Sequence, residues 1–190
     1  MMPAMHAVSR PVQPTHDAPL LGVDPGLQRT GYAVLCVASD LENARLIEAG
    51  VVRLARHTPL PHRLLELEAG LTDVINQHRP AAVACEELYA HYKHPRTAIL
   101  MAHARGVILA LASRQGLPLI SIAATNVKKL LTGSGHAGKR QVQQAVAATL
   151  RLPRLPEPPD VADAIAIALA GARLRRALAL KPLASSRVRT

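Results

Sequence analysis

Between Leu20 and Ile122 the apolar residues are divided into short runs of strand length, and this division most constrains the fold. The first three runs follow one another with only short polar turns between them, which is typical of an antiparallel meander. Each of the last two follows a segment with helical features, as in a strand-helix-strand crossover. The five expected strands lie at residues 20–24, 30–37, 46–54, 81–85 and 118–122.

The intervening and following segments are expected to be helices. Apolar residues recur at steps of three and four in the first of them, where Pro61 suits a first helical turn. The expected helices lie at residues 61–77, 95–115, 125–131, 139–152 and 160–180. This order predicts an α/β fold with a mixed five-stranded sheet flanked by helices.

We expect one domain, because 190 residues suffice for one substantial core. The domain is expected over residues 20–174. Residues 1–19 are interpreted as a disordered, Pro-rich leader without the apolar stretch of a signal peptide. Residues 175–190 are interpreted as a basic C-terminal tail.

Positive charge is concentrated in one part of the chain. The formal net charge is +10, and residues 88–156 contain ten Lys and Arg but no Asp or Glu. Charges scattered around a solvated surface would include some acidic residues, so we interpret this stretch as a basic face on a folded domain. Such a face fits a polyanion such as nucleic acid.

Four acidic residues occupy positions where a solvated surface charge is unexpected. Asp24 and Glu86 each follow an apolar strand, and a crossover would place these two strands side by side. Asp160 and Asp163 begin an apolar helix three residues apart, so both project from one face of its first turn. Taken singly, each acid also fits a structural role in a turn, a strand end, a helix cap or a first turn.

Taken together, the four acids favour a metal site. Converging carboxylates repel one another strongly unless cations are bound, and they suit hard ions such as Mg²⁺ or Mn²⁺. Two such ions would support in-line attack of water on a phosphodiester. Zinc would require His or Cys ligands, which are not arranged for it in this sequence.

With these residues in view, the sequence resembles the RuvC family of Holliday-junction resolvases. The resemblance runs from Leu20 to about Leu174 and depends on six motifs that occur in family order. They are Gly22-Val23-Asp24-Pro25-Gly26 with Thr30-Gly31-Tyr32, Ala84-Cys85-Glu86-Glu87, Ala104-Arg105-Gly106-Val107, Val127-Lys128-Lys129, Gly133-Ser134-Gly135 with Lys139, and Asp160-Val161-Ala162-Asp163-Ala164.

The resemblance implies an RNase H-like fold and a homodimer whose two active sites nick opposed strands of a four-way junction symmetrically. It further implies two ions, Mg²⁺ or Mn²⁺, in each active site. Asp24 would bridge the metals, Glu86 and Asp163 would complete the ligand set, and Asp160 would be a direct ligand or lie just outside it. The expected helix at 95–115 resembles the helix through which the family dimerises, although ordinary core packing would also explain its composition.

The resemblance also implies residues that contact DNA. Lys128 and Lys139 match basic positions near the scissile phosphates, and Arg140 follows in the same acid-free stretch. Tyr89 matches an aromatic position at the junction centre, where its ring could stack on an unpaired base. RuvA and RuvB, which drive branch migration, are implied as partners by the resemblance alone.

Two further expectations concern the compartment. Cys36 and Cys85 are isolated in apolar runs, which indicates buried free thiols in a reducing compartment, the cytoplasm. No apolar run is long enough to span a bilayer, so no membrane association is expected.

Two other functions stay open from the residues. An actin-like ATPase or kinase domain also places an Asp-x-Gly turn after its first strand, but it needs a second domain. A junction-binding protein without catalysis would not need Asp160 and Asp163 together with Glu86.

Overall fold

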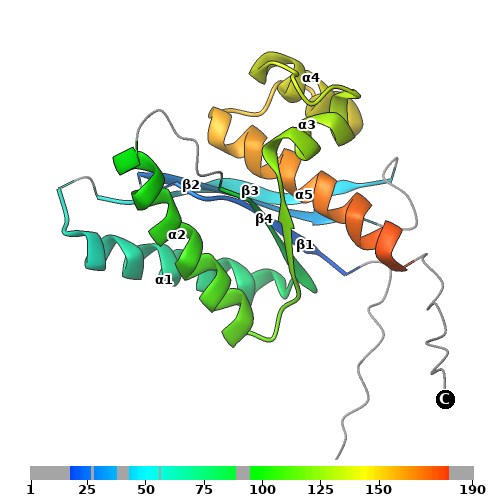
Figure 1. Ribbon diagram of the computed structural model, residues 1–190. Helices are drawn as coiled ribbons and strands as arrows, with labels where there is room; N and C mark the ends of the chain where they lie inside the picture. The colour runs from blue at the N-terminus through cyan, green and yellow to red at the C-terminus, as the bar shows by residue number, and fades with distance from the viewer. Residues whose placement is uncertain (1–17, 27, 38–42, 56, 89–94, 180–190) are drawn as a thin grey trace, which may run out of the picture.

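The computed structural model describes residues 18–26, 28–37, 43–55, 57–88 and 95–179 (Figure 1). Most of the expected leader and residues 180–190 of the expected tail therefore lie outside the described residues. Residues 175–179, also assigned to the tail from the sequence, belong to the last helix.

Five strands form one mixed sheet in the described part of the chain, as the sequence predicts. The strands are β1 (Leu20–Asp24), β2 (Arg29–Cys36), β3 (Arg45–Arg53), β4 (Ala82–Glu86) and β5 (Leu119–Ile122). Their order across the sheet is β3-β2-β1-β4-β5. The β1–β2 and β2–β3 pairs are antiparallel, whereas β1–β4 and β4–β5 are parallel.

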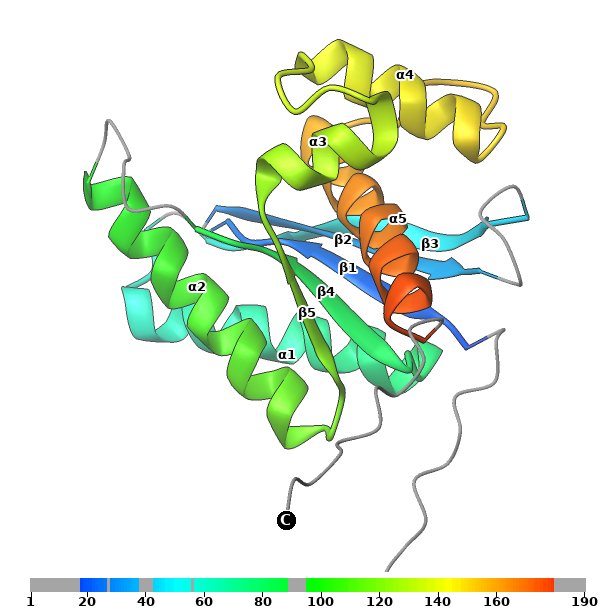
Figure 2. The same cartoon turned by 45° about the vertical axis from the view of Figure 1, so that its right-hand side comes forward.

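The helices lie in two layers, one on each face of the sheet (Figures 1 and 2). They are α1 (Leu60–His78), α2 (Pro95–Arg114), α3 (Ala124–Thr132), α4 (Lys139–Thr149) and α5 (Pro159–Ala179). Helices α1 and α2 cover one face, and α5 crosses the other beneath α3 and α4. Each face has its own apolar core, so the alternating side chains of the central strands are buried on both sides.

Helix α5 is the most deeply buried helix because it lies between the sheet and the α3–α4 pair. From Val161 to Ala170 every residue except Asp163 is buried. Glycines in the sheet permit this close packing. A Cβ atom added at Gly31 would lie 2.1 Å from the Asp160 carbonyl oxygen, and one added at Gly22 would lie 2.5 Å from the Ala164 carbonyl oxygen. The sheet surface therefore fixes the position of the α5 N-terminal turn.

The expectations for cysteines and membranes can be compared directly with the structure. Cys36 and Cys85 form no disulfide, and Cys85 is fully buried as expected, whereas Cys36 is only half-buried because it lies at the end of β2. Burial raises the pKa of the Cys85 thiol to about 12, which keeps it protonated and unreactive. Among the residues that can be described, no helix is both long and apolar enough to cross a membrane.

Candidate active site

Asp24 and Glu86 lie at the same edge of the sheet because they end neighbouring parallel strands. Val23 pairs with Cys85 in the β1–β4 register, and both side chains belong to the core beneath α1 and α2. Side chains alternate along a strand, so the next residue in each strand projects toward α5. The structure therefore brings the first two predicted acids onto one face.

The other two acids come from the first turn of α5, which packs across the ends of β1 and β2. Asp163 lines a small pocket together with Glu86 and Lys128, so it faces the same space as Glu86. Asp160 is not among the residues that line this pocket, and its Oδ2 lies 3.9 Å from Nη1 of Arg29 at the start of β2. Asp160 therefore lies at the outer side of the group.

The electrostatics shows that the acids form one interacting set. Burial raises the pKa of Asp24 to about 7, with further increases from the charges of Glu86, Asp163 and Asp160. Burial also raises the pKa of Glu86 to about 7, and the Asp163 charge adds to this increase. Burial likewise raises the pKa of Asp163. The ionised carboxylates of β1, β4 and α5 therefore destabilise one another.

Two lysines lower the pKa values of these acids. Lys139 at the start of α4 lowers the pKa of Asp24 and of Asp163, and Lys128 in α3 lowers the pKa of Glu86 and of Asp163. Both are thus close enough to stabilise the ionised acids. Arg140 is exposed beside Lys139, and it is not among the groups that shift these pKa values. Tyr89, predicted to stack on DNA, lies outside the described residues.

The donor set fits hard divalent cations. All four candidate ligands are carboxylates, which Mg²⁺ and Mn²⁺ prefer. Burial and then mutual repulsion raise the pKa values of Asp24 and Glu86, and bound cations would relieve the repulsion. Within the described ranges, no three Asp, Glu, His or Cys side chains are already gathered closely enough to hold one metal ion. The structure therefore shows interacting carboxylates and not a fully assembled coordination sphere.

Thr30 shapes the turn that follows Asp24, a role that the sequence motif did not reveal. Its buried Oγ1 donates a hydrogen bond of 2.6 Å to the Gly26 carbonyl oxygen and accepts one of 3.3 Å from the Gly26 amide. These bonds close the loop between β1 and β2 beside the carboxylates. The Thr30-Gly31-Tyr32 motif gave no sign of this contact, because the contact depends on how the loop folds back.

Two arginines were also missed. No role was assigned from the sequence to Arg29, which directly precedes the Thr30-Gly31 motif. In the structure it pairs with Asp160. Arg105 was recognised within a motif but received no function, and it contacts the main chain of Glu86. A basic residue beside a motif is a weak signal, because pairing partners this distant in sequence emerge only from the fold.

Comparisons with known proteins agree with this geometry. Residues 20–171 match the family model described as crossover junction endodeoxyribonuclease RuvC. The protein of that name from Rhodopirellula baltica is 49% identical over 154 residues, which cover 80% of this chain and 84% of the relative. The protein from Leifsonia xyli is 43% identical over 150 residues, which cover 79% of this chain and 71% of the relative.

Solved structures show the same fold. Thermus thermophilus RuvC in complex with a Holliday junction substrate superposes with a TM-score of 0.79 at 35% identity, covering 87% of this chain and 99% of that one. A yeast mitochondrial Holliday junction resolvase has a TM-score of 0.59 at 18% identity and is similar in fold alone. The predicted RNase H-like fold is confirmed, and this chain belongs to the RuvC family of crossover junction endodeoxyribonucleases.

Proposed function

We propose that this protein is a structure-specific endodeoxyribonuclease that resolves four-way DNA junctions by nicking two opposed strands. One observation carries the proposal: Asp24, Glu86 and Asp163 form a single repelling carboxylate group with Lys128 and Lys139 beside it. Family membership supports the same reaction and gives no support to an actin-like ATPase or a non-catalytic binder.

Family membership implies a metal-dependent nuclease, and we propose two Mg²⁺ or Mn²⁺ ions in each active site. Asp24 would bridge them, Glu86 and Asp163 would complete the ligand set, and Asp160 would be a ligand or lie just outside. When bound, the ions supply a nucleophilic water and stabilise the charge that develops on the phosphate. The proposal is supported by the all-carboxylate donor set and by the mutual repulsion of its members.

The protein's own side chains would orient the DNA. Lys128 and Lys139 are point charges near the acids, so we propose that they contact phosphates near the scissile bond. Arg140, exposed at the start of α4, would add a phosphate contact further out. Tyr89 stays a proposed stacking residue at the junction centre.

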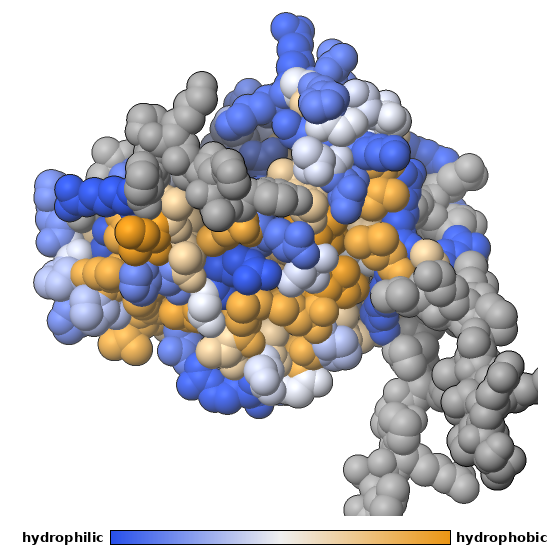
Figure 3. All heavy atoms as spheres, in the orientation of Figure 1, coloured by the Kyte–Doolittle hydropathy of each residue, from blue (hydrophilic) through white to orange (hydrophobic). Residues whose placement is uncertain are grey.

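We further propose a homodimer formed through α2, which would place two active sites on opposed strands. Apolar residues gather on the molecular face that contains α2 (Figure 3). Ile99 in α2 is 58% exposed and Leu119 in β5 is 38% exposed. Exposed apolar surface of this kind commonly marks a contact with another protein.

Other parts of the proposal depend on resemblance. RuvA and RuvB would be the branch-migration partners, residues 20–174 would form the catalytic unit, and residues 1–19 and 175–190 would lie outside it. The cytoplasm is the proposed compartment, supported by two cysteines that form no disulfide.

Cleavage of a panel of substrates tests the proposal. Four-way, forked and linear duplex DNA and an RNA-DNA hybrid are incubated with Mg²⁺ or Mn²⁺ and either wild type or Asp24→Asn. Wild type should nick the four-way junction selectively, and Asp24→Asn should bind it without cutting. Asp73→Asn, which changes an exposed acid in α1, is the matched control and should cut normally. Equal cutting of linear duplex or of the hybrid would refute junction specificity.

A further inference from the structure

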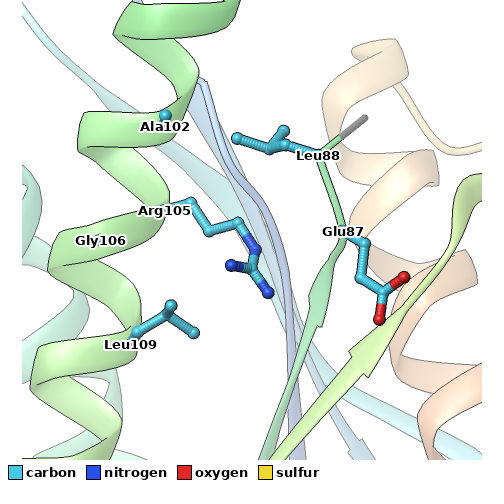
Figure 4. A pocket seen from close by; sticks show the side chains of 6 residues that line it. All are labelled: Glu87, Leu88, Ala102, Arg105, Gly106 and Leu109. Atoms are coloured by element: carbon cyan, nitrogen blue, oxygen red, sulfur yellow. The ribbon is translucent and has the colours of Figure 1, made fainter. Parts of the chain in front are cut away.

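Arg105 in α2 points toward the strand end at which Glu87 follows β4 (Figure 4). Its Nε donates a hydrogen bond of 3.0 Å to the main-chain carbonyl oxygen of Glu86. Its Nη2 donates one of 2.9 Å to Oγ of Ser121 in β5. One guanidinium thus joins α2 to the ends of two neighbouring strands.

This contact is made from the face of the sheet opposite the carboxylates. Cys85 and Ser121 are partners in the β4–β5 register, and the Cys85 side chain belongs to the core beneath α1 and α2. The Glu86 side chain therefore projects to the other face, where it lines a pocket with Lys128 and Asp163. Arg105 holds the Glu86 main chain from behind and leaves the carboxylate available for a ligand.

The hydrogen bond from Arg105 restrains β4 at its end, where β5 also ends and offers few further hydrogen bonds. The Glu87 amide donates a hydrogen bond of 2.9 Å to the Ile122 carbonyl oxygen, and Ile122 is the last residue of β5. Arg105 adds a second attachment one residue earlier, at Glu86. Two contacts therefore fix the direction of the Glu86 side chain: the hydrogen bond between Glu87 and Ile122, and the hydrogen bond from the Arg105 guanidinium.

Hydrogen bonding, more than close packing, holds the Arg105 side chain in this position. It borders an open pocket of about 410 Å³ that is also lined by Glu87, Leu88 and Gly106. A Cβ atom added at Gly106 would meet nothing within 4 Å, so the helix surface beside Arg105 is open. A planar guanidinium suits such a site because its fork can satisfy two acceptors in fixed geometry.

We propose that Arg105 is a positioning residue for Glu86, which it orients through the main chain of β4. The inference rests on the proposed function, in which Glu86 is a metal ligand. Groups that orient a metal ligand from outside the coordination sphere commonly affect metal affinity or activity about 10- to 100-fold. Arg105 is in a position to do so without contacting metal or DNA phosphate at this site.

The test compares Arg105→Gln and Arg105→Lys with wild type. Arg114→Gln is the matched control, because Arg114 lies on the same helix and pairs with Glu68 in α1. Mn²⁺ binding to the protein alone is measured from the electron paramagnetic resonance signal of free Mn²⁺. Single-turnover junction cleavage is measured against Mn²⁺ concentration, and junction binding is measured with Ca²⁺ in place of Mn²⁺.

We expect Arg105→Gln to weaken Mn²⁺ binding about 10-fold and to slow cleavage at saturating DNA about 10- to 100-fold. Junction binding should stay within about twofold of wild type, because phosphate contacts dominate DNA affinity. Arg105→Lys should show most of the same loss, since an ammonium group lacks the planar fork. Arg114→Gln should behave as wild type.

Unchanged Mn²⁺ binding in Arg105→Gln, even with a lower melting temperature, would overturn the inference in favour of simple packing. Full activity of Arg105→Lys would also overturn it, because charge and not geometry would then be sufficient. If Arg105→Gln does not fold, Ser121→Ala removes one of the two bonds and should weaken Mn²⁺ binding about two- to fivefold; wild-type binding in that variant would reject the role. Failure of the proposed function is distinguishable, because wild type would then bind Mn²⁺ but cut no junction.

Discussion

Replacing Asp24 by Asn should stabilise the metal-free protein, and the gain should depend on pH. Burial, then the charges of Glu86, Asp163 and Asp160, raises the Asp24 pKa from 3.8 to about 7. Between these two values the folded protein holds more protons at this site than the unfolded chain does. The stability of wild type therefore falls as the pH rises from about 4 to about 7, and Asn removes this dependence.

The size of the effect follows from the pKa difference. The rise of the Asp24 pKa from 3.8 to about 7 corresponds to about 4 kcal/mol of unfolding free energy at pH 8.5 as an upper limit. At pH 4.5 the pH has risen only a little above 3.8, where the difference in bound protons begins to accumulate, so only about 1 kcal/mol of the penalty is present. Because Asp24 keeps some solvent contact, we expect Asp24→Asn to gain about 2 kcal/mol more at pH 8.5 than at pH 4.5.

Urea denaturation in EDTA, followed by far-ultraviolet circular dichroism, measures this difference; the chain contains no Trp for fluorescence. Asp73→Asn is the control and should show no comparable pH-dependent gain, because Asp73 is exposed on α1. Addition of Mn²⁺ at pH 8.5 should stabilise wild type more than Asp24→Asn, since only wild type keeps the full ligand set. An equal effect of Asp24→Asn at both pH values would refute the view that these acids repel one another in a buried site.

Three further predictions concern other parts of the site. Gly22→Ala should lower the free energy of unfolding by about 1–3 kcal/mol in urea denaturation, because its Cβ atom would lie 2.5 Å from an α5 carbonyl oxygen; unchanged stability would contradict the close packing of α5 on β1. Lys128→Gln and Lys139→Gln should each reduce the slope of log junction affinity against log salt concentration by about 1, measured by fluorescence anisotropy, if each lysine contacts a phosphate. Asp163→Asn should slow single-turnover junction cleavage about 10-fold or more beyond Asp160→Asn, because Asp163 lines the pocket with Glu86 and Asp160 does not. The reverse order would show that Asp160 is the more important ligand.

The sequence predicted the fold well because its apolar runs are short and clearly separated. All five strands and the five helices were expected within a few residues of their observed bounds. The helix expected at 139–152 ends earlier, at Thr149. Helix ends depend on local capping more than on the apolar pattern, so such differences are ordinary.

The site was predictable in its acids and not in its supporting contacts. Asp24 and Glu86 could be paired because a crossover puts their strands in parallel, and Asp160 and Asp163 because they share one helical turn. The contacts of Arg29 with Asp160 and of Arg105 with Glu86 join residues far apart in sequence. No local periodicity encodes such pairs, so only the folded structure reveals them.

Contrary to the expectation from the sequence, the basic side chains of residues 88–156 do not all lie on one face. Lys128 and Lys139 lie beside the acids, as the interpretation of a basic face requires. Arg105, in contrast, contacts the end of the sheet, and Arg114 pairs with Glu68 in α1. The concentration of positive charge in the sequence therefore indicated nucleic acid as the kind of partner, but it did not indicate which basic residues lie beside the acids.

Mapping the cuts strand by strand in a labelled four-way junction tests directly whether these carboxylates form one nuclease site. We predict two nicks at equivalent positions on opposed strands with Mg²⁺ or Mn²⁺, and none with Asp24→Asn, although that variant still binds the junction. Nicks at unrelated positions, or undiminished cutting by Asp24→Asn, would contradict the assignment of Asp24, Glu86 and Asp163 to one nuclease site.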